Sequence, residues 1–412
     1  MKVLFLIHQF YPNYSTGTEK FILNLAKMMQ RCGHRVKVIT YSFHPSWFYQ
    51  YRLSGFAIKE YVYESVPVLA FRFRKHPEDL HFALGDSEMA QVGVELLQRE
   101  NPDIVHIGHS MRVAGFIKSA RQLNIPYVVT LTDFFLMCPK YILVRSNGSL
   151  CSGPESGLAC TQHCPELPND RIPKRLVEAQ ALLAQANAVA APSQFLAKTF
   201  QREFPGLQPI LIRHGMSFHN LKSNSRRYQR GDRIVFGYAG SLNTHKGVHI
   251  LIEAFMSARL SEAELKIYGK NATSRHYVNS LKKASYSCKN ISFCGEYAAG
   301  QLAEVLQGID VIVLPSLWHE NAPLILCEAL ASNVPVIVSD AGGMNETVRN
   351  DFNGFIFRMG DVRNLSEILQ TIVENPETLN RLKENIRLMT FPTIEQEAYA
   401  YEQIYKEIRI PS

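Results

Sequence analysis

Short apolar runs alternate with helical segments along this chain, and this alternation restricts its fold more than any other feature. The first run, 2–7 (KVLFLI), precedes an amphipathic helix that opens at Gly17, and a second run follows at 36–39. Apolar side chains recur at helical spacing between these runs. A strand, a helix and a second parallel strand form a βαβ unit, whose strands are buried on both faces. The sequence therefore predicts an α/β protein with parallel sheets covered by helices.

The alternation continues as two successive series. The first half has further strand candidates at 66–73, 104–107, 127–131, 188–191 and 209–212, and the second half has them at 234–238, 264–268, 291–293, 311–314, 336–338 and 355–357. Two such series without a strand meander favour two doubly wound domains. We predict an N-terminal domain at 1–214, a polar, basic linker at 215–232 and a C-terminal domain at 233–390. A last helix, within 393–412, is expected to pack back on the N-terminal domain.

Composition excludes several classes of protein. The chain has 412 residues, of which 46% are hydrophobic and 20% charged, as in soluble globular proteins. No apolar stretch approaches the roughly 18 residues of a membrane span, and the run at 3–7 is too short for a signal-peptide core. We therefore expect a cytoplasmic protein. The net charge of +7 is modest, and no compact basic motif suggests nucleic-acid binding.

Two glutamates in the second half, Glu320 and Glu328, are the strongest candidates for a ligand site. Glu328 falls inside a segment that predicts a buried helix after Pro323, and Glu320 falls just before that helix. A buried carboxylate is costly unless it is partnered, so Glu328 needs donors. Ribose hydroxyls would supply them, and the free N–H groups at the helix start would suit a diphosphate. A structural ion pair for Glu328 and a solvated loop for Glu320 remain the alternatives.

Other polar and glycine residues follow predicted strands. In doubly wound sheets, ligands bind beyond the carboxyl ends of the strands. The positions that directly follow strands include Gly17, Asp133, 240–247, Gly269, Gly295, 316–320 and 340–343. Most belong to the second half, which is therefore expected to hold the main ligand. The Gly-x-Gly-x-x-Gly fingerprint of dinucleotide-dependent oxidoreductases is missing.

Three segments of the second half carry a family resemblance. They are 240–247 (GSLNTHKG), 315–331 (with Glu320-x7-Glu328) and 335–346 (PVIVSDAGGMNE). In order and spacing they resemble the family 4 retaining glycosyltransferases, and the turn at 17–19 resembles the N-terminal glycine turn of that family. The resemblance implies the GT-B fold, in which two Rossmann-like domains face each other across a cleft.

The resemblance also implies a reaction. A sugar would pass from a nucleotide-sugar donor to a hydroxyl of a glycan or lipid-linked acceptor, with retained anomeric configuration, in the assembly of bacterial surface polysaccharide or glycolipid. No cofactor and no essential divalent metal are expected, since the family lacks an Asp-x-Asp metal ligand and none occurs here. The alternatives are a nucleotide-sugar epimerase of the same fold and a catalytically idle partner protein.

Residue roles follow from the same resemblance. Lys246 would hold the donor diphosphate, Glu328 the ribose and Glu320 the transferred sugar, which makes Lys246 and Glu320 the catalytic candidates. The remaining positions implied in donor binding are Gly17, Ser241, Gly295, Asn321, Ala322 and Leu324. The paired glycines Gly342 and Gly343 are expected to permit tight backbone geometry.

The chain departs from the family at two positions. The family usually has arginine where this chain has Ser241, so diphosphate binding would depend on Lys246 or on another basic group such as His245. The family often has histidine before the post-strand aspartate, where this chain has Thr132. The acceptor-side candidates are His106, His109 and Asp133.

Eight cysteines divide into two groups. Cys138, Cys151, Cys160 and Cys164 fall in one segment, where a structural zinc, a disulfide or reduced thiols are all open. The other four, Cys32, Cys288, Cys294 and Cys327, are expected to be small buried hydrophobic residues.

Aromatic and basic residues mix at 47–51 (WFYQY) and 71–75 (FRFRK). Such segments suit a membrane interface or a lipid-linked acceptor, which would place the protein peripherally on the inner face of the membrane. The alternative is an inter-strand loop followed by an ordinary strand.

Overall fold

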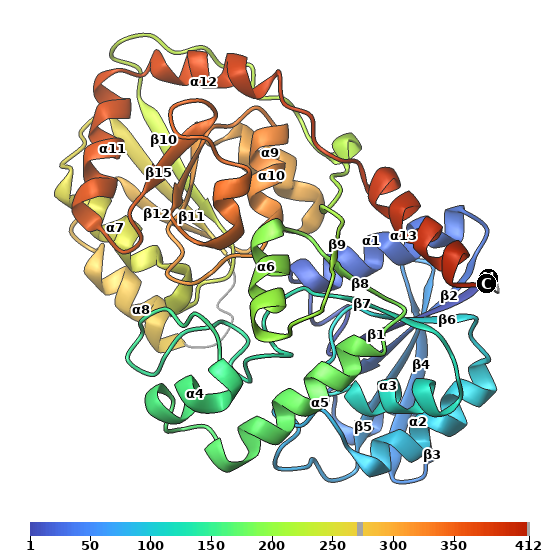
Figure 1. Cartoon of the computed structure of the whole chain (residues 1–412). Helices are drawn as coiled ribbons and strands as arrows, with labels where there is room; N and C mark the ends of the chain where they lie inside the picture. Colours follow the sequence, from blue (N-terminus) through green and yellow to red (C-terminus); the bar gives the residue numbers. More distant parts are fainter. Residues whose placement is uncertain (270–274, 410–412) are drawn as a thin grey trace. The chain divides into compact units, whose positions relative to one another are not determined.

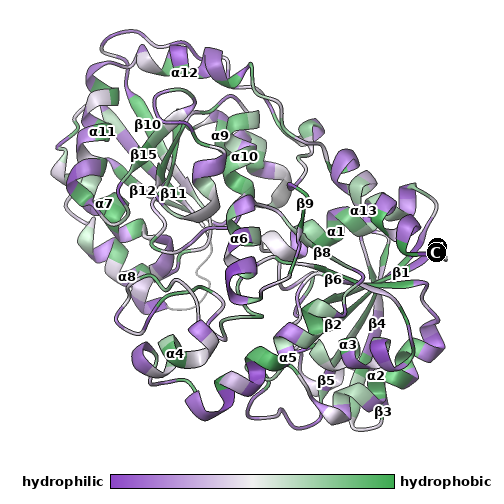
Figure 2. Cartoon of the chain, viewed as in Figure 1, coloured by the Kyte–Doolittle hydropathy of each residue, from purple (hydrophilic) through white to green (hydrophobic). Residues whose placement is uncertain are grey.

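The computed structural model describes residues 1–269 and 275–409 and has α/β architecture throughout (Figure 1). The chain divides into two compact units, one formed by Met1–His214 with Ile394–Ser412 and the other by Gly215–Thr393. Each unit is built on one sheet, whose strands are among the most hydrophobic segments (Figure 2). Within the described residues, no helix is long and apolar enough to cross a membrane.

The sheet of the first unit has the strand order β3-β4-β5-β2-β1-β6-β7-β8-β9. Its strands are β1 (Lys2–Ile7), β2 (Arg35–Tyr41), β3 (Tyr51–Leu53), β4 (Phe56–Tyr63), β5 (Val66–Phe73), β6 (Ile104–Ile107), β7 (Tyr127–Thr130), β8 (Ala188–Ala191) and β9 (Ile210–Leu211). From β5 to β9 all neighbours are parallel, whereas β3, β4 and β5 pair antiparallel. The expectation of no strand meander was therefore wrong for this half. In β4, buried Phe56 and Ile58 alternate with less buried residues, so no continuous apolar run marks the strand.

Helices cover this sheet on both faces (Figure 1). They are α1 (Gly17–Arg31), α2 (Ser87–Glu100), α3 (Ala114–Gln122), α5 (Ile172–Ala184), α6 (Gln194–Glu203) and α13 (Ile394–Arg409). The short helix α4 (Leu158–His163) lies in the cysteine loop. The start of α1 is fixed by a capping box, in which Glu19 accepts a hydrogen bond from the backbone N–H of Thr16 at 2.7 Å. The last helix, α13, belongs to this unit and packs beside α1 (Figure 1).

His106 lies in the contact between β6 and α13. It is fully buried, with Nδ1 bonded to the Tyr405 hydroxyl and Nε2 2.8 Å from Thr130 Oγ1. The Thr130 hydroxyl also bonds to the hydroxyl of Tyr401, at 2.9 Å. Both imidazole nitrogens are therefore occupied inside the core. This position corrects the prediction that His106 serves the acceptor side, since it fastens α13 to the sheet instead.

Acidification is expected to destabilise the protein through His106. Burial lowers the pKa of His106 to about 3, against 6.5 for an ordinary histidine. Between these pH values the unfolded chain binds a proton that the folded chain does not. The free energy of unfolding therefore falls as the pH drops from 6.5 toward 3, by at most about 1.4 kcal/mol per pH unit from this residue. Urea unfolding between about pH 4 and 7 measures this slope.

The His106→Gln variant, although less stable overall, is expected to show the smaller slope. His276→Gln, which replaces an exposed histidine, is the matched control and keeps the native slope. Equal slopes for the native protein and His106→Gln would contradict the assignment.

The sheet of the second unit is entirely parallel, in the order β12-β11-β10-β13-β14-β15. Its strands are β10 (Ile234–Ala239), β11 (Ala263–Tyr268), β12 (Ile291–Gly295), β13 (Val311–Leu314), β14 (Val336–Ser339) and β15 (Gly354–Phe357). Its helices are α7 (Val248–Ser257), α8 (Arg275–Ala284), α9 (Leu302–Gln307), α10 (Leu324–Ala331), α11 (Val362–Glu374) and α12 (Thr378–Ile386).

Residues 215–232, expected to be a linker, are part of this second unit. Tyr228 is buried, and its hydroxyl donates to Asp310 at 2.8 Å. The buried Lys383 of α12 donates to Asn224 Oδ1 at 2.9 Å. Polar composition indicated a solvated linker here, but specific hydrogen bonds hold the segment on the sheet and on α12.

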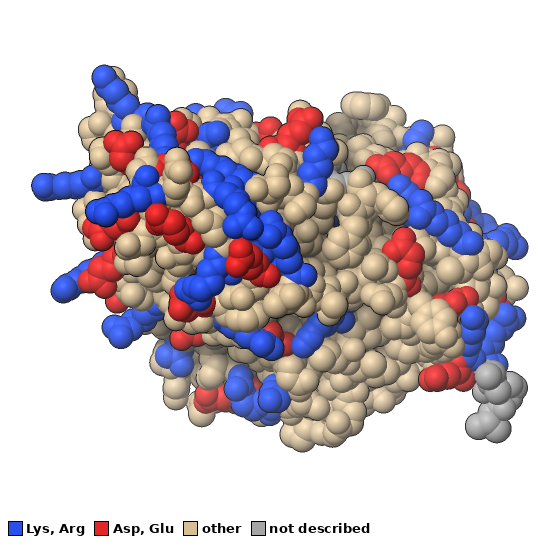
Figure 3. Space-filling view, turned by 90° about the horizontal axis from the view of Figure 1, so that it is seen from above, with Lys and Arg blue, Asp and Glu red and all other residues tan. Residues whose placement is uncertain are grey.

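Seen from above, many Lys and Arg side chains gather over part of one face, with Asp and Glu among them (Figure 3).

Candidate functional site

The first element of the site is the turn after β10. It contains the short 3₁₀ helix η5 (Thr244–Lys246) and ends at Gly247. This glycine is the N-cap of α7 and has a φ of +70°. A Cβ on Gly247 would lie 1.8 Å from the backbone oxygen of Pro315, so only glycine allows this approach. The backbone N–H of Leu317 donates to the oxygen of His245 at 2.8 Å. These contacts bring Lys246 against the loop that follows β13.

That second loop places Glu320, which is only 5% exposed. One carboxylate oxygen, Oε1, accepts three hydrogen bonds: from Lys246 Nζ at 2.7 Å, from Ser316 Oγ at 2.6 Å and from Trp318 Nε1 at 2.8 Å. The Lys246 ammonium also lies 4.8 Å from the centre of the Trp318 ring. Glu320 is therefore a buried carboxylate in a built polar network, and the solvated-loop alternative was wrong.

The network fixes the charges of the site. Burial opposes ionisation of Glu320, but the charge of Lys246 and the hydrogen bonds from Lys246, Ser316 and Trp318 outweigh it and lower its pKa. At neutral pH the pair is thus a carboxylate facing an ammonium. Burial, together with the charge of Lys246, lowers the pKa of His245 to about 4. At pH 7 His245 is therefore neutral and adds no second positive charge to the Lys246–Glu320 pair.

The glycines after β14 hold the backbone of Glu320. Gly343 N–H donates to the Glu320 backbone oxygen at 2.6 Å. Gly342 has a φ of +64°, and a Cβ there would lie 2.2 Å from the same oxygen. Ser339 Oγ, at the end of β14, donates to the backbone oxygen of Ser316 at 2.7 Å. Hydrogen bonds from the end of β14 and the turn after it therefore fix the loop that carries Glu320.

Gly342→Ala is expected to disrupt the close approach of Gly342 to the backbone of Glu320. A methyl group would be strained by the positive φ and would collide with backbone, which together cost about 2–5 kcal/mol of the free energy of unfolding. Chemical denaturation measures that loss. Gly300→Ala is the matched control, because nothing lies within 4 Å of a Cβ there. Native stability of Gly342→Ala would show that the close approach is not required.

The other predicted donor-side residues lie around the carboxyl edge of the same sheet. Glu328 is in the second turn of α10 and is 9% exposed. Burial and the charge of Glu328 raise the pKa of Tyr297 to about 12, so the two side chains are neighbours. The backbone oxygen of Ser241 accepts from the Tyr238 hydroxyl at 2.7 Å, and Gly295 ends β12 with a φ of +79°.

The start of α10 carries the remaining donor-side positions. Asn321 is buried, Ala322 is half-buried and Leu324 is the first residue of α10, with Pro323 as its N-cap. Gly17, by contrast, belongs to the first unit, as the first residue of α1. Of these predicted residues, the structure thus brings all but Gly17 to the second sheet.

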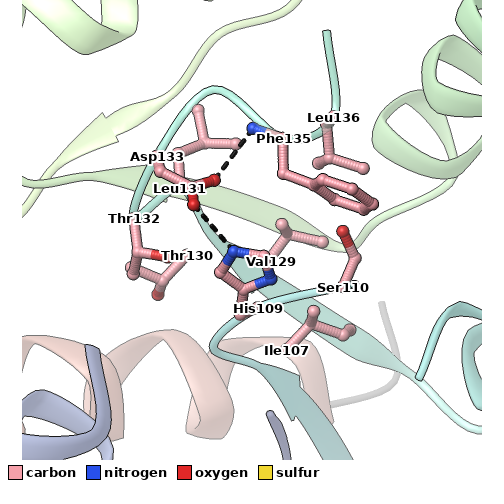
Figure 4. Close-up of a pocket in the computed structure, with 10 residues that line it drawn as sticks. All are labelled: Ile107, His109, Ser110, Val129, Thr130, Leu131, Thr132, Asp133, Phe135 and Leu136. Atoms are coloured by element: carbon pink, nitrogen blue, oxygen red, sulfur yellow. Dashed lines mark hydrogen bonds and ion pairs between the residues drawn. The ribbon is translucent and has the colours of Figure 1, made fainter. Parts of the chain in front are cut away.

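The first unit has a separate, small pocket beyond the ends of β6 and β7, whose volume of about 10 Å³ is room for about one water molecule (Figure 4). His109 and Asp133 face each other in it, with Nε2 and Oδ2 2.7 Å apart. The backbone N–H of Met111 donates to His109 Nδ1 at 3.1 Å, so the proton lies on Nε2 and is donated to Asp133. Thr132, at the position of the family histidine, donates to the Gly108 oxygen at 3.0 Å.

Two residues near these sites, Trp318 and His8, were given no role from the sequence. The indole N–H of Trp318 donates a hydrogen bond to Glu320, and its ring lies against the Lys246 ammonium. Its position two residues before Glu320 was the sequence signal that could have identified it. His8 stacks on His109 with ring centres 4.0 Å apart, and its Nε2 lies 3.7 Å from Glu19 Oε1. Burial, then the charges of His109 and Arg112, lower the pKa of His8 well below its usual range. Histidine directly after a buried strand was the signal here.

The cysteine loop holds free thiols in this structure. Cys138, Cys151, Cys160 and Cys164 are all buried, and burial raises the pKa of Cys138 to about 11. No group of three or more His, Cys, Asp and Glu residues in the described part of the chain is arranged to hold a metal ion. A zinc site in this loop stays an untested hypothesis. Of the other four cysteines, Cys32 and Cys294 are exposed, so their predicted burial was wrong. Cys32 is the C-cap of α1, and Cys294 lies on the edge strand β12.

Two family models match the chain. Residues 222–389 match the model described as glycosyl transferases group 1, and residues 16–211 match the glycosyl transferase 4-like domain. Among curated proteins, an uncharacterised glycosyltransferase of Methanocaldococcus jannaschii is 22% identical over 359 residues, which are 86% of this chain and 84% of the relative. A shorter match, 36% identical over 86 residues, covers 21% of this chain and 22% of the UDP-Gal:alpha-D-GlcNAc-diphosphoundecaprenol alpha-1,3-galactosyltransferase of Escherichia coli.

Solved structures match the whole chain. Sucrose-phosphate synthase of Thermosynechococcus elongatus superposes with a TM-score of 0.74 at 17% identity, over 99% of this chain and 98% of the other. The Anabaena protein HepE, in complex with UDP and glucose, gives a TM-score of 0.72 at 19% identity over 100% of both chains. At these identities the likeness establishes the fold alone.

Proposed function

Since this chain belongs to the group 1 family of glycosyltransferases and has the GT-B fold, we propose that it transfers a sugar from a nucleotide-sugar donor to an acceptor hydroxyl with retained anomeric configuration. The observation that carries the proposal is the Lys246–Glu320 pair, in which the buried Glu320 also bonds Trp318, on the carboxyl edge of the second sheet. A cation and a carboxylate fixed there provide one group for a diphosphate and one for sugar hydroxyls.

Donor binding divides among the residues of this edge. Lys246 holds the diphosphate, assisted by the N–H groups at the start of α10. Glu328 binds the ribose hydroxyls, and Gly295 leaves room for the base. Glu320 uses Oε2 for a hydroxyl of the transferred sugar, because Oε1 already accepts three bonds. The donor is a nucleoside diphosphate sugar, and uridine is the first base to test because HepE was solved with UDP.

Catalysis is electrostatic in this proposal. As the bond to the diphosphate breaks, negative charge grows on the leaving oxygens, and Lys246 stabilises it in a site whose groups are already oriented. The leaving diphosphate accepts the proton of the acceptor hydroxyl. His109 is not needed as the base, since both of its nitrogens are engaged with Met111 and Asp133. No essential divalent metal takes part.

On the acceptor side, Asp133, held by His109 at 2.7 Å, orients the acceptor hydroxyl in this proposal. A glycan or lipid-linked acceptor of bacterial surface polysaccharide assembly is proposed. Its support is the local similarity to the galactosyltransferase of Escherichia coli and to the lipopolysaccharide 1,2-N-acetylglucosaminetransferase of Salmonella typhimurium, 25% identical over 181 residues.

The test is turnover of nucleotide sugars with candidate acceptors, with and without a chelator. The expected result is a glycoside whose anomeric configuration, read by NMR, equals that of the donor, at a rate that the chelator leaves unchanged. An inverted product, or loss of transfer on chelation, would overturn the corresponding part of the proposal. Formation of an epimer without acceptor would favour the epimerase, and no turnover with any donor that binds would favour the idle partner.

A further inference from the structure

One loop of the first unit exposes large aromatic side chains. It follows β2 and contains the 3₁₀ helix η1 (Ser46–Phe48). Trp47 is 81% exposed and Phe43 is 39% exposed. Exposing two large aromatic groups four residues apart gives up a substantial hydrophobic free energy, and such a patch typically marks an interaction site.

Cations stand beside this loop on the same face of the sheet. Arg52, Ala57 and Arg72 are cross-strand neighbours on β3, β4 and β5, so Arg52 and Arg72 share a face. Arg72 reaches the loop, donating to the backbone oxygen of His44 at 2.8 Å with its guanidinium 5.3 Å from the Tyr49 ring centre. Lys59 Nζ lies 5.8 Å from the ring centre of Phe48. We call this region, residues 42–52 with Lys59, Arg72, Arg74 and Lys75, the aromatic–basic surface.

Positive charge exceeds negative charge on the aromatic–basic surface. Its segments, 42–59 and 66–77, contain five Lys and Arg residues and no Asp or Glu. The acidic residue after the first segment, Glu60, already pairs with Lys37 and Arg99. Three further acidic residues are near: Glu88 of α2 lies beside Gly55 at the turn between β3 and β4, and Glu78 and Asp79 follow the second segment, where Asp79 pairs with Arg171. An excess of positive charge around an exposed indole is complementary to an anionic surface.

We propose that the aromatic–basic surface binds the anionic surface of a lipid bilayer. Tryptophan prefers the interfacial layer of a bilayer, and Lys and Arg near the surface are attracted by acidic headgroups. The loop leaves the sheet at the end of β2, and the pocket of His109 and Asp133 opens beyond the ends of β6 and β7. Because these strands are parallel, both features lie at one edge of the sheet. If the proposed function holds, a lipid-linked acceptor would approach the His109–Asp133 pair from this edge.

Co-sedimentation with vesicles tests the proposal. The native protein is expected to bind vesicles of phosphatidylcholine and phosphatidylglycerol, to bind vesicles of phosphatidylcholine alone at least about tenfold more weakly, and to release with salt. Trp47→Ala and the double variant Arg74→Glu/Lys75→Glu should each weaken binding by about tenfold or more. Tyr286→Ala is the matched control, because that tyrosine is 91% exposed on the second unit. It should bind as the native protein does.

Fluorescence gives a second readout, since the chain has only two tryptophans and Trp318 is 9% exposed. Emission should shift to shorter wavelength on acidic vesicles, and Trp47→Phe should keep binding but lose the shift. No vesicle binding by the native protein, or native binding by Trp47→Ala, would overturn the proposal. So would a dimer that Trp47→Ala abolishes, which would assign the surface to a second copy. Turnover of nucleotide sugar with a water-soluble acceptor should be unchanged in Trp47→Ala, so loss of the proposed function and loss of vesicle binding are distinguishable.

Discussion

Lys246→Ala is expected to lower kcat/KM for glycosyl transfer by about a hundredfold to a thousandfold, the usual effect of removing one group that stabilises transition-state charge. The variant removes the ammonium that lies 2.7 Å from Glu320 and 4.8 Å from the Trp318 ring centre. With Ser241 and a neutral His245 nearby, no other cation in this turn replaces it. Steady-state kinetics with donor and acceptor varied separately measures the loss.

The matched control for Lys246→Ala is Lys283→Ala. Lys283 is exposed in α8 of the same unit and should change kcat/KM by less than about twofold. Turnover by Lys246→Ala within about threefold of the native rate would contradict the assignment.

Glu320→Gln is expected to lower kcat by about a hundredfold while the protein stays folded. Glutamine preserves the volume and can still accept from Ser316 and Trp318, but it carries no charge. Lys246 then loses its counter-charge, and the sugar hydroxyl loses its carboxylate acceptor. Thermal unfolding checks the fold, and kcat is measured at saturating donor. The Glu304→Gln variant, in α9 of the same unit, is the control and should keep native kcat.

The two variants are also expected to be non-additive. Because Lys246 and Glu320 act as one pair, the double variant should lose little more activity than the worse single variant. Fully additive losses would show two independent contributions and would contradict a coupled pair.

Much of the fold was predictable because the buried parallel strands are continuous apolar runs. The predicted bounds of β1, β5, β6, β8 and β13 equal the observed ones. The β3–β4 hairpin was not predicted, since strands with one half-exposed face give only weak alternation. The place of 215–232 in the second unit was also hidden, because it depends on contacts such as Lys383 with Asn224, far apart in sequence.

The candidate site was predictable to the extent that local spacing determines it. The strand-end position of Glu320 followed from the pattern around it, but its bond to Lys246 joins residues 74 positions apart. Two properties of the histidines were not predictable from residue type alone. Burial lowers the pKa of His245, and the folded core brings Tyr405 to His106.

Binding of nucleoside diphosphates, measured by isothermal titration calorimetry with UDP, GDP and ADP, tests most directly whether Lys246 and Glu320 form a nucleotide-sugar site. The native protein should bind one of the three, and Lys246→Ala should bind it at least about tenfold more weakly, as expected for a lost charge-assisted hydrogen bond. The corresponding nucleoside, which has no phosphate, should bind equally weakly to both proteins. Equal diphosphate affinity of the native protein and Lys246→Ala would contradict the account.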